Sequence, residues 1–300
     1  MRIKLIANPV SGGDARPRIE LACEALARSG AEVDLCLTLA RGDARKAAAQ
    51  ALTEGYDRVV AAGGDGTLNE VVNGIASPDL PIAFLPFGTV NVFALEAGIP
   101  KDLDAACALA VTGVARPITL GRVNDELFLL MVSSGWDAEA VAHVRTDLKK
   151  RIGRLAYAVS ALEILCKKPS SPLTLVTEDG MPHEGFGVVI SNCRYYGGRY
   201  VVTPEASMFH DQLDVCLLRR GGRLAMLRFA LNLVLKRPLR EPLVEFFTLS
   251  AAQLQGASVA MQVDGDVGAP LPAKIEAVPQ AVRMILPVTC KIGTKTQKDV

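Results

Sequence analysis

The first third of the chain alternates short apolar runs with longer amphipathic segments. The apolar runs are IKLIAN, AEVDLCLT, DRVVAAG and PIAFLP, and helical spacing of apolar positions follows them at 16–29, 43–52, 67–75 and 101–111. Nearly continuous apolar strands that alternate with helices indicate a parallel sheet covered on both faces. The pattern therefore predicts an N-terminal α/β domain with a doubly wound parallel sheet.

From about Val123 the chain changes to short strands separated by turns. ELFLLMVSSG reads as a strand, and 138–149 and 155–166 read as helices. Further strands are predicted at LTLVTE, GFGVVISN, LDVCLLR, VEFFTLS, SVAMQVDG, AKIEAVP and AVRMILP, with one helix at 223–236 among them. Strands spaced by turns are typical of an antiparallel sandwich or barrel. We therefore expect a second, mostly β domain, with the boundary near 121–126.

Composition and charge exclude several classes of protein. The chain has 300 residues, is 50% hydrophobic and carries a net charge of +1, so nothing in its overall charge favours nucleic acid as a partner. The seven cysteines include no CxxC pair, which argues against a metal cluster and suits a reducing cytosol. No apolar run reaches the ~18 residues needed to span a bilayer. We expect a cytoplasmic protein, peripheral at most on the inner face of the membrane.

The segment RVVAAGGDGTLNEVVNGI carries the first chemical signal. Gly63, Gly64 and Gly66 leave a strand, and Thr67 opens a helix. Glycines allow close approach, and a helix N-terminus offers unpaired N–H groups to an anion such as phosphate. Walker A is absent, and the dinucleotide pattern G-x-G-x-x-G fails at Asn69. The loop predicts a phosphate site of another type.

Asp65 stands among these glycines and would repel phosphates if it were bare. A bridging Mg²⁺ removes that conflict, because it commonly joins carboxylates to phosphates. A simple strand–helix turn would explain one or two of the glycines but not this aspartate. The loop therefore predicts a Mg²⁺–nucleotide site.

Two further polar turns follow strands of the same predicted sheet. NPVSGG, with Asn8 and Ser11, follows the first strand, and PFGTVN, with Thr89 and Asn91, follows the fourth. Each alone would be an ordinary turn. Because the carboxyl ends of parallel strands meet at one edge, we expect all three loops to lie together.

Five blocks in this order carry a family resemblance: NPVSG, GGDGTLNEVVNGI, PFGTVNVFA, YYGGRYVVTPEA followed by LDV, and MQVDGD. Together they resemble the diacylglycerol kinase catalytic-domain family, within the NAD kinase/phosphofructokinase-like superfamily. The resemblance implies a nucleotide-binding α/β domain of 1–123 with 287–300, and a β-sandwich lipid-substrate domain of 124–286. It also implies ATP and Mg²⁺ as cofactors. The residues implied to bind ATP are Asn8, Ser11, Thr38, Gly63, Gly64, Asp65, Gly66, Thr67, Asn69 and Thr89.

The chain departs from the family pattern at two carboxylates. The family usually ends its DGE turn with a glutamate proposed as general base, whereas this chain has Asp266. A base must come within ~3 Å of its proton, so Asp266 needs a deeper substrate or a water relay. Alternatively, Asp264 and Asp266 are simple turn residues. The family also has an Asp-Gly pair before its LDV block, and that aspartate helps to bind a structural Mg²⁺. Counting back from Leu213 places His210 and Asp211 at this pair, so Asp211 would have to take the role from the neighbouring position.

These features predict an ATP-dependent phosphotransferase that acts on a lipid hydroxyl of diacylglycerol, ceramide or sphingoid-base type. NAD kinase is disfavoured because PFGTVN and VDGD follow the lipid-kinase pattern. A weakly active lipid- or nucleotide-binding regulator is the other alternative. It is suggested by Asp266, by His210 and by Val92, which stands where some family members have an aspartate. Basic segments at 145–154 and 223–240 suggest peripheral contact with the membrane, although both would also suit solvated helix faces. An oligomer is compatible with the sequence.

Overall fold

A computed structural model describes residues 1–135, 138, 171–257, 259–288 and 290. The predicted helices at 138–149 and 155–166 and the basic segment at 145–154 lie outside the described residues. The chain divides into two compact units. Unit 1 contains Met1–Leu120, Ser207–Asp211 and the described residues from Val278 onward, and unit 2 contains the remaining described residues.

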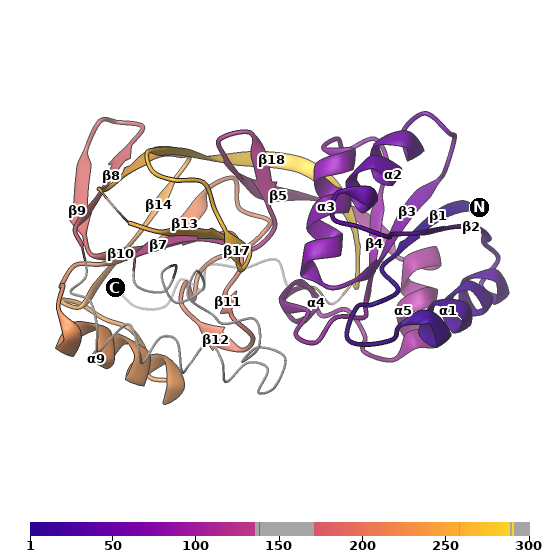
Figure 1. The fold of residues 1–300 in the computed structure, drawn as a ribbon, viewed down its shortest axis with the longest axis horizontal. Coiled ribbons are helices and arrows are strands. Elements are labelled where there is room, and N and C mark those ends of the chain that lie inside the picture. Colours follow the sequence, from indigo (N-terminus) through magenta and orange to yellow (C-terminus); the bar gives the residue numbers. More distant parts are fainter. Residues whose placement is uncertain (136–137, 139–170, 258, 289, 291–300) are drawn as a thin grey trace. The chain divides into compact units, whose positions relative to one another are not determined.

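Unit 1 is built on parallel strands in the order β2-β1-β3-β4. These strands are β1 (Arg2–Ala7), β2 (Glu32–Leu37), β3 (Arg58–Gly63) and β4 (Ile82–Pro86). Its helices are α1 (Arg16–Arg28), α2 (Asp43–Ala51), α3 (Asp65–Ile75), α4 (Val92–Ala97) and α5 (Leu103–Thr112). Helices α1 and α5 cover one face of the sheet, and α2 and α3 cover the other (Figure 1). The doubly wound parallel sheet is therefore confirmed.

The apolar runs follow from burial on both faces of this sheet. Ile3, Leu5 and Ala7 alternate along β1 and join the core under α1 and α5, and Ile6 between them is also fully buried. A strand that is covered on both sides favours apolar residues, and the two polar residues of β1, Arg2 and Lys4, lie toward its N-terminal end.

Strand β18 (Ala273–Leu286) takes part in both units. Its first residues pair antiparallel with β15 (Ala251–Gln255), and Met284 pairs in parallel with Ile82 of β4. The prediction of two strands here was wrong. Proline removes one N–H donor, but the strand continues past Pro279, and the next residue, Gln280, is left-handed with φ of 51°.

Unit 2 consists mainly of two facing sheets. One is antiparallel, in the order β14-β13-β10-β7-β16-β17, and the other continues through β18, β15, β8 and β9, with β5 and β6 at its side. The strands not yet located are β5 (Val114–Val123), β6 (Glu126–Phe128), β7 (Met131–Gly135), β8 (Leu173–Thr177), β9 (Pro182–Gly185), β10 (Gly187–Ser191), β11 (Tyr195–Tyr196), β12 (Tyr200–Val201), β13 (Leu213–Leu218), β14 (Val244–Leu249), β16 (Met261–Val263) and β17 (Asp266–Val267). Residues such as Leu175 and Val215 from the two sheets share one core, so the predicted sandwich is confirmed.

Among the described residues of unit 2, the helix α9 (Arg223–Val234) begins where the sequence predicts it. In the part of the chain that the structure describes, no helix is long and apolar enough to cross a membrane. The expected boundaries place Ser207–Asp211 and the last residues of β18 in the second domain. In the structure, both segments belong to unit 1.

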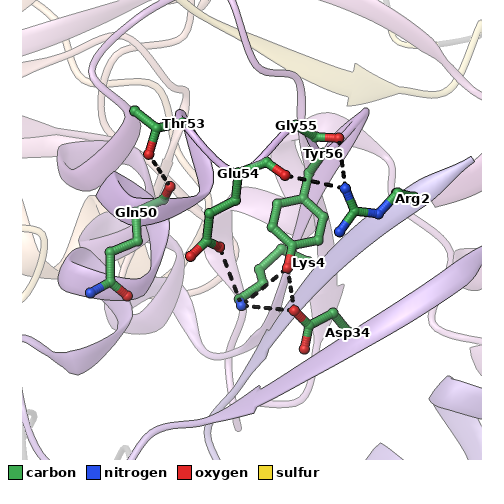
Figure 2. A network of polar contacts seen from close by, with 8 residues as sticks. All are labelled: Arg2, Lys4, Asp34, Gln50, Thr53, Glu54, Gly55 and Tyr56. Atoms are coloured by element: carbon green, nitrogen blue, oxygen red, sulfur yellow. Dashed lines mark hydrogen bonds and ion pairs between the residues drawn. The ribbon is translucent and has the colours of Figure 1, made fainter.

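A polar network joins β1, β2 and the turn before β3 (Figure 2). The Lys4 ammonium lies 3.0 Å from Asp34 Oδ2, 3.3 Å from Tyr56 Oη and 3.6 Å from Glu54 Oε2. Tyr56 also donates to Asp34, and the guanidinium of Arg2 lies 4.9 Å from the centre of the Tyr56 ring. Burial alone would lower the pKa of Lys4, but the hydrogen bonds to Asp34 and Tyr56 raise it above its ordinary value.

We expect Lys4→Met to lower the free energy of unfolding by about 1–2 kcal/mol, because Asp34, Tyr56 and Glu54 lose a partly buried ammonium. Hydrogen bonds from Tyr56 and Lys4 lower the pKa of Asp34, so this stabilisation is present above the ordinary carboxyl pKa. The stabilisation disappears as the pH falls through the lowered pKa of Asp34. Urea denaturation as a function of pH measures the difference. Arg28→Met, which removes an exposed ion pair with Asp104, is the control and should cost less than about 0.5 kcal/mol. Equal stability of Lys4→Met and the wild type would contradict the assignment.

Candidate active site

Three loops meet at the carboxyl ends of β1, β3 and β4. The N–H groups of Phe87 and Gly88 donate to the carbonyl oxygen of Gly63 at 2.7 and 3.0 Å. A Cβ atom on Gly12 would lie 2.4 Å from the carbonyl oxygen of Phe87, and one on Gly88 would lie 2.7 Å from the Cα of Gly64. The contact thus has room for backbone only, which explains the glycines in all three loops.

Asn8 and Thr67 join the first two of these loops. The Asn8 N–H donates to the Ala62 carbonyl oxygen at 2.9 Å, and its Nδ2 lies 3.5 Å from Thr67 Oγ1. Thr67 is buried and packs over Gly63, where a Cβ atom would lie 2.4 Å from Oγ1. Both polar side chains that were predicted to bind nucleotide therefore also hold the loops together.

The start of α3 offers unused hydrogen-bond donors. Its N-cap is Gly64 in an extended conformation, and the first bond into the helix runs from the Leu68 N–H to the Gly64 carbonyl oxygen at 3.1 Å. The N–H groups of Asp65, Gly66 and Thr67 donate to no acceptor among the residues that the structure describes. Gly66 is exposed, and a Cβ atom there would meet nothing within 4 Å. Such an open helix N-terminus suits an anion.

Asp65 points from this loop to the start of α4. Its Oδ2 accepts the N–H of Val92 at 2.8 Å, and its Oδ1 accepts the N–H of Phe93 at 3.0 Å. Burial raises the pKa of Asp65, and the bonds from Phe93 and Val92 offset this only in part. The sequence analysis accounted for a carboxylate in this loop by a bridging cation. The two N–H groups that Asp65 binds also account for it.

Asp65 still fits a Mg²⁺ ion in this loop. A carboxylate has about four lone-pair positions, and the two N–H groups occupy two of them. Mg²⁺ is often held by one or two carboxylates together with substrate phosphates and water. The described residues contain no group of three His, Cys, Asp or Glu side chains that could hold a metal, so phosphate oxygens and water would complete the shell. Asp211, the other predicted ligand, is exposed and belongs to no such group in the described part of the chain.

The remaining predicted nucleotide-binding residues lie around this loop cluster. Ser11 Oγ lies 3.8 Å from where a Cβ on Gly64 would be, so the structure brings these two loops together. Thr89 is exposed in the third loop. Asn69 lies in α3, where its Oδ1 accepts from Asn73 Nδ2 at 3.0 Å.

Thr38 lies directly after β2, and its side chain is buried. Its N–H donates to the carbonyl oxygen of Ala7 at 2.9 Å. Glu70 of α3 accepts the N–H groups of Gly42 and Ala44 at 3.0 and 3.2 Å and so holds the turn that follows Thr38. The sequence analysis had no role for Glu70, since its partners lie 28 and 26 residues away.

Arg18 and Asn91 are candidate site residues that the sequence analysis did not select as ligands. The guanidinium of Arg18 lies 4.2 Å from the centre of the Phe87 ring and donates to the Phe87 carbonyl oxygen at 3.5 Å. Asn91 is left-handed, with φ of 52°, and its Nδ2 donates to the Gly88 carbonyl oxygen at 2.7 Å. Its buried Oδ1 has no hydrogen-bond partner among the described residues. The sequence could have indicated Asn91 as a site residue, because it lies beside a glycine turn. Nothing in the sequence around Arg18 indicated that it would lie at the site.

In unit 2, Asp264 stabilises the backbone. It forms a two-residue turn with Gly265, in which both residues have positive φ, 49° and 89°. Its carboxylate accepts the N–H groups of Leu129, Leu130 and Met131 at 2.7, 2.8 and 3.0 Å. The turn joins β16 to β17, as expected for left-handed residues in a tight hairpin.

Asp266, the predicted general base, is exposed at the start of β17. It pairs in register with Val263 of β16. The hairpin thus separates two roles, since Asp264 is used for structure and Asp266 remains accessible.

Comparison with known proteins decides the family. Residues 2–123 match the model of the diacylglycerol kinase catalytic domain, and residues 130–286 match the YegS C-terminal NAD kinase beta sandwich-like domain. The chain belongs to the diacylglycerol kinase catalytic-domain family. The resemblance stated from five sequence blocks is thereby confirmed.

Two relatives show the extent of the similarity. The chain is 36% identical to a probable lipid kinase YegS-like of Pseudomonas aeruginosa over 72% of both chains. It is 29% identical to the diacylglycerol kinase of Bacillus subtilis, over 95% of this chain and 96% of that one.

Solved structures share the fold. A putative diacylglycerol kinase from Bacillus anthracis aligns with a TM-score of 0.82 at 21% identity, over 97% of this chain and 96% of that one. An NAD kinase from Archaeoglobus fulgidus in complex with ATP aligns with a TM-score of 0.51 at 16% identity, over 93% and 90%. The NAD kinase-like fold assigned from sequence is therefore confirmed.

We expect Asp65→Ala to lower the free energy of unfolding by about 1–3 kcal/mol, because two N–H groups at the start of α4 lose their acceptor. Asp65→Asn should recover part of this loss, since the amide oxygen accepts one bond. Urea denaturation followed by circular dichroism measures both. Asp102→Ala is a matched control, because Asp102 caps α5 through a single bond to the Ala105 N–H, and it should cost about 1 kcal/mol. An Asp65→Ala variant as stable as the wild type would rule out the capping role.

Proposed function

We propose that this protein transfers the γ-phosphate of ATP to the hydroxyl group of a lipid of diacylglycerol, ceramide or sphingoid-base type. The observation that carries the proposal is the cluster of three glycine loops around the open N-terminus of α3. Membership of the diacylglycerol kinase catalytic-domain family supports the choice of a lipid as acceptor.

The loop cluster suits phosphoryl transfer because that reaction needs positioning and charge stabilisation more than covalent help. The free N–H groups of Asp65, Gly66 and Thr67 would receive phosphate oxygens. The guanidinium of Arg18 adds positive charge beside the third loop. Thr38 and Thr89 are proposed as further nucleotide contacts.

Mg²⁺, when bound, neutralises charge that develops on the phosphate oxygens. We assign Asp65 to hold it, through the lone-pair positions that α4 leaves unused. The same carboxylate keeps the start of α4 in place, so it would couple the order of the third loop to the metal site.

We assign Asp266 as the general base toward the lipid hydroxyl. A positioned base typically contributes about 10²–10⁴-fold to the rate. Asp264 is excluded from this role, because three backbone N–H groups bind its carboxylate and hold it in the turn.

Incubation with γ-labelled ATP and Mg²⁺ and a panel of lipids and NAD tests the reaction. We expect label in diacylglycerol, ceramide or a sphingoid base, and none in NAD. Label in NAD alone would replace the proposal by NAD kinase activity. ATP binding without transfer to any acceptor would instead favour the regulator.

The role of Asp266 is tested by Asp266→Asn, which should lower kcat by about 10²–10⁴-fold because the amide cannot accept a proton. Asp266→Glu should keep substantial activity, since it restores a carboxylate at this position. Asp125→Asn is the control, because Asp125 is another exposed aspartate of unit 2. A wild-type kcat for Asp266→Asn would remove Asp266 from the mechanism.

A further inference from the structure

Helix α9 lies at the outside of unit 2 (Figure 1). Its sequence exposes an apolar stripe. The stripe consists of Leu224, Leu227, Leu231, Val234 and Leu235, whose exposed fractions are 80%, 42%, 48%, 62% and 54%. At 3.6 residues per turn, these five positions fall within about 100° of the helix circumference. The exposed aliphatic residues therefore form one continuous face rather than scattered positions.

The opposite face of α9 anchors the helix to its unit. Met226 and Phe229 are buried, with 1% and 6% exposed. Phe229 and Leu233 line a small apolar cavity together with Val188 of β10 and Cys216 of β13. The helix thus already has a core-facing side, and the apolar stripe is an additional surface.

Basic residues predominate along α9 and the segments next to it in the sequence. Residues 219–240 contain seven Arg or Lys and no Asp or Glu. Arg228 lies next to the stripe on the helix, and Lys236, Arg237 and Arg240 follow it; all four are exposed. A cationic border around an aliphatic face complements an anionic lipid surface, where each cation favours binding by about five-fold.

The residue types favour a bilayer over a protein partner. Protein interfaces are enriched in aromatic anchors, whereas the stripe contains only Leu and Val. Aliphatic side chains flanked by long cationic ones are the composition of helices that lie in the headgroup region.

We propose that α9 docks on an anionic lipid bilayer. The apolar stripe enters the boundary between headgroups and acyl chains, and Arg228, Lys236, Arg237 and Arg240 contact the headgroups. The inference deepens the proposed function, because a lipid kinase must reach its acceptor at a bilayer. Docking itself requires no turnover, so the two can be tested separately.

Sedimentation of the full chain with lipid vesicles tests the docking. Vesicles of phosphatidylcholine mixed with phosphatidylglycerol should bind the protein more tightly than vesicles of phosphatidylcholine alone, and added salt should weaken the difference. Leu224→Glu combined with Leu231→Glu should weaken binding to the anionic vesicles by about tenfold or more. The matched control is Leu21→Glu with Leu52→Glu, which changes the charge equally at exposed leucines of unit 1 and should bind like the wild type.

A second variant keeps the test independent of the fold of α9. Arg228→Gln with Arg237→Gln removes two cations and should weaken binding to anionic vesicles by about 25-fold, with little change toward phosphatidylcholine. Circular dichroism checks that each variant keeps its helix content.

The outcomes separate the alternatives. Unchanged vesicle binding by both the leucine and the arginine variants would overturn the proposal. Light scattering that shows a dimer in the wild type and a monomer in the leucine variant, with no vesicle binding by either, would assign the stripe to a second copy of the chain. Vesicle binding without phosphate transfer to any lipid would overturn the proposed function and still support docking.

Discussion

The closeness of three loops is the constraint on which the candidate site depends. At the carboxyl ends of β1, β3 and β4, backbone lies against backbone, and side chains on Gly12, Gly63 or Gly88 would collide with Phe87, Thr67 or Gly64. This packing brings the open N-terminus of α3 beside the turn that begins α4. Any bulky substitution at these glycines would separate the loops and with them the donors that would receive phosphate.

Two partly buried carboxylates show how acidic residues hold backbone segments in place. Asp65 in unit 1 and Asp264 in unit 2 each accept backbone N–H groups at the start of a segment. Asp65 binds two N–H groups and keeps lone pairs for a metal, whereas Asp264 binds three. The same residue type, at the start of a helix and in a hairpin turn, thus supports different roles.

Much of the fold was predictable because apolar periodicity reports burial directly. The parallel strands, the helices between them and the antiparallel strands of unit 2 follow from this pattern. Contacts between distant residues were not predictable. Arg18 meets Phe87 across 69 residues, and neither position carries a local sign of the other. The sequence analysis predicted two strands on either side of Pro279 for a similar reason. The two ends of β18 pair with different neighbours, which the local sequence does not show.

The sequence by itself determined the family, the glycine loops and the two candidate carboxylates, because these depend on residue type and order along the chain. Only the tertiary structure decided what each polar group does. It assigned Asp264 to the backbone, gave Asp65 a capping role beside its possible metal role, and left the apolar stripe of α9 exposed. The physical reason is that hydrogen bonding and burial depend on neighbours in space, and the pairing of elements decides which neighbours those are.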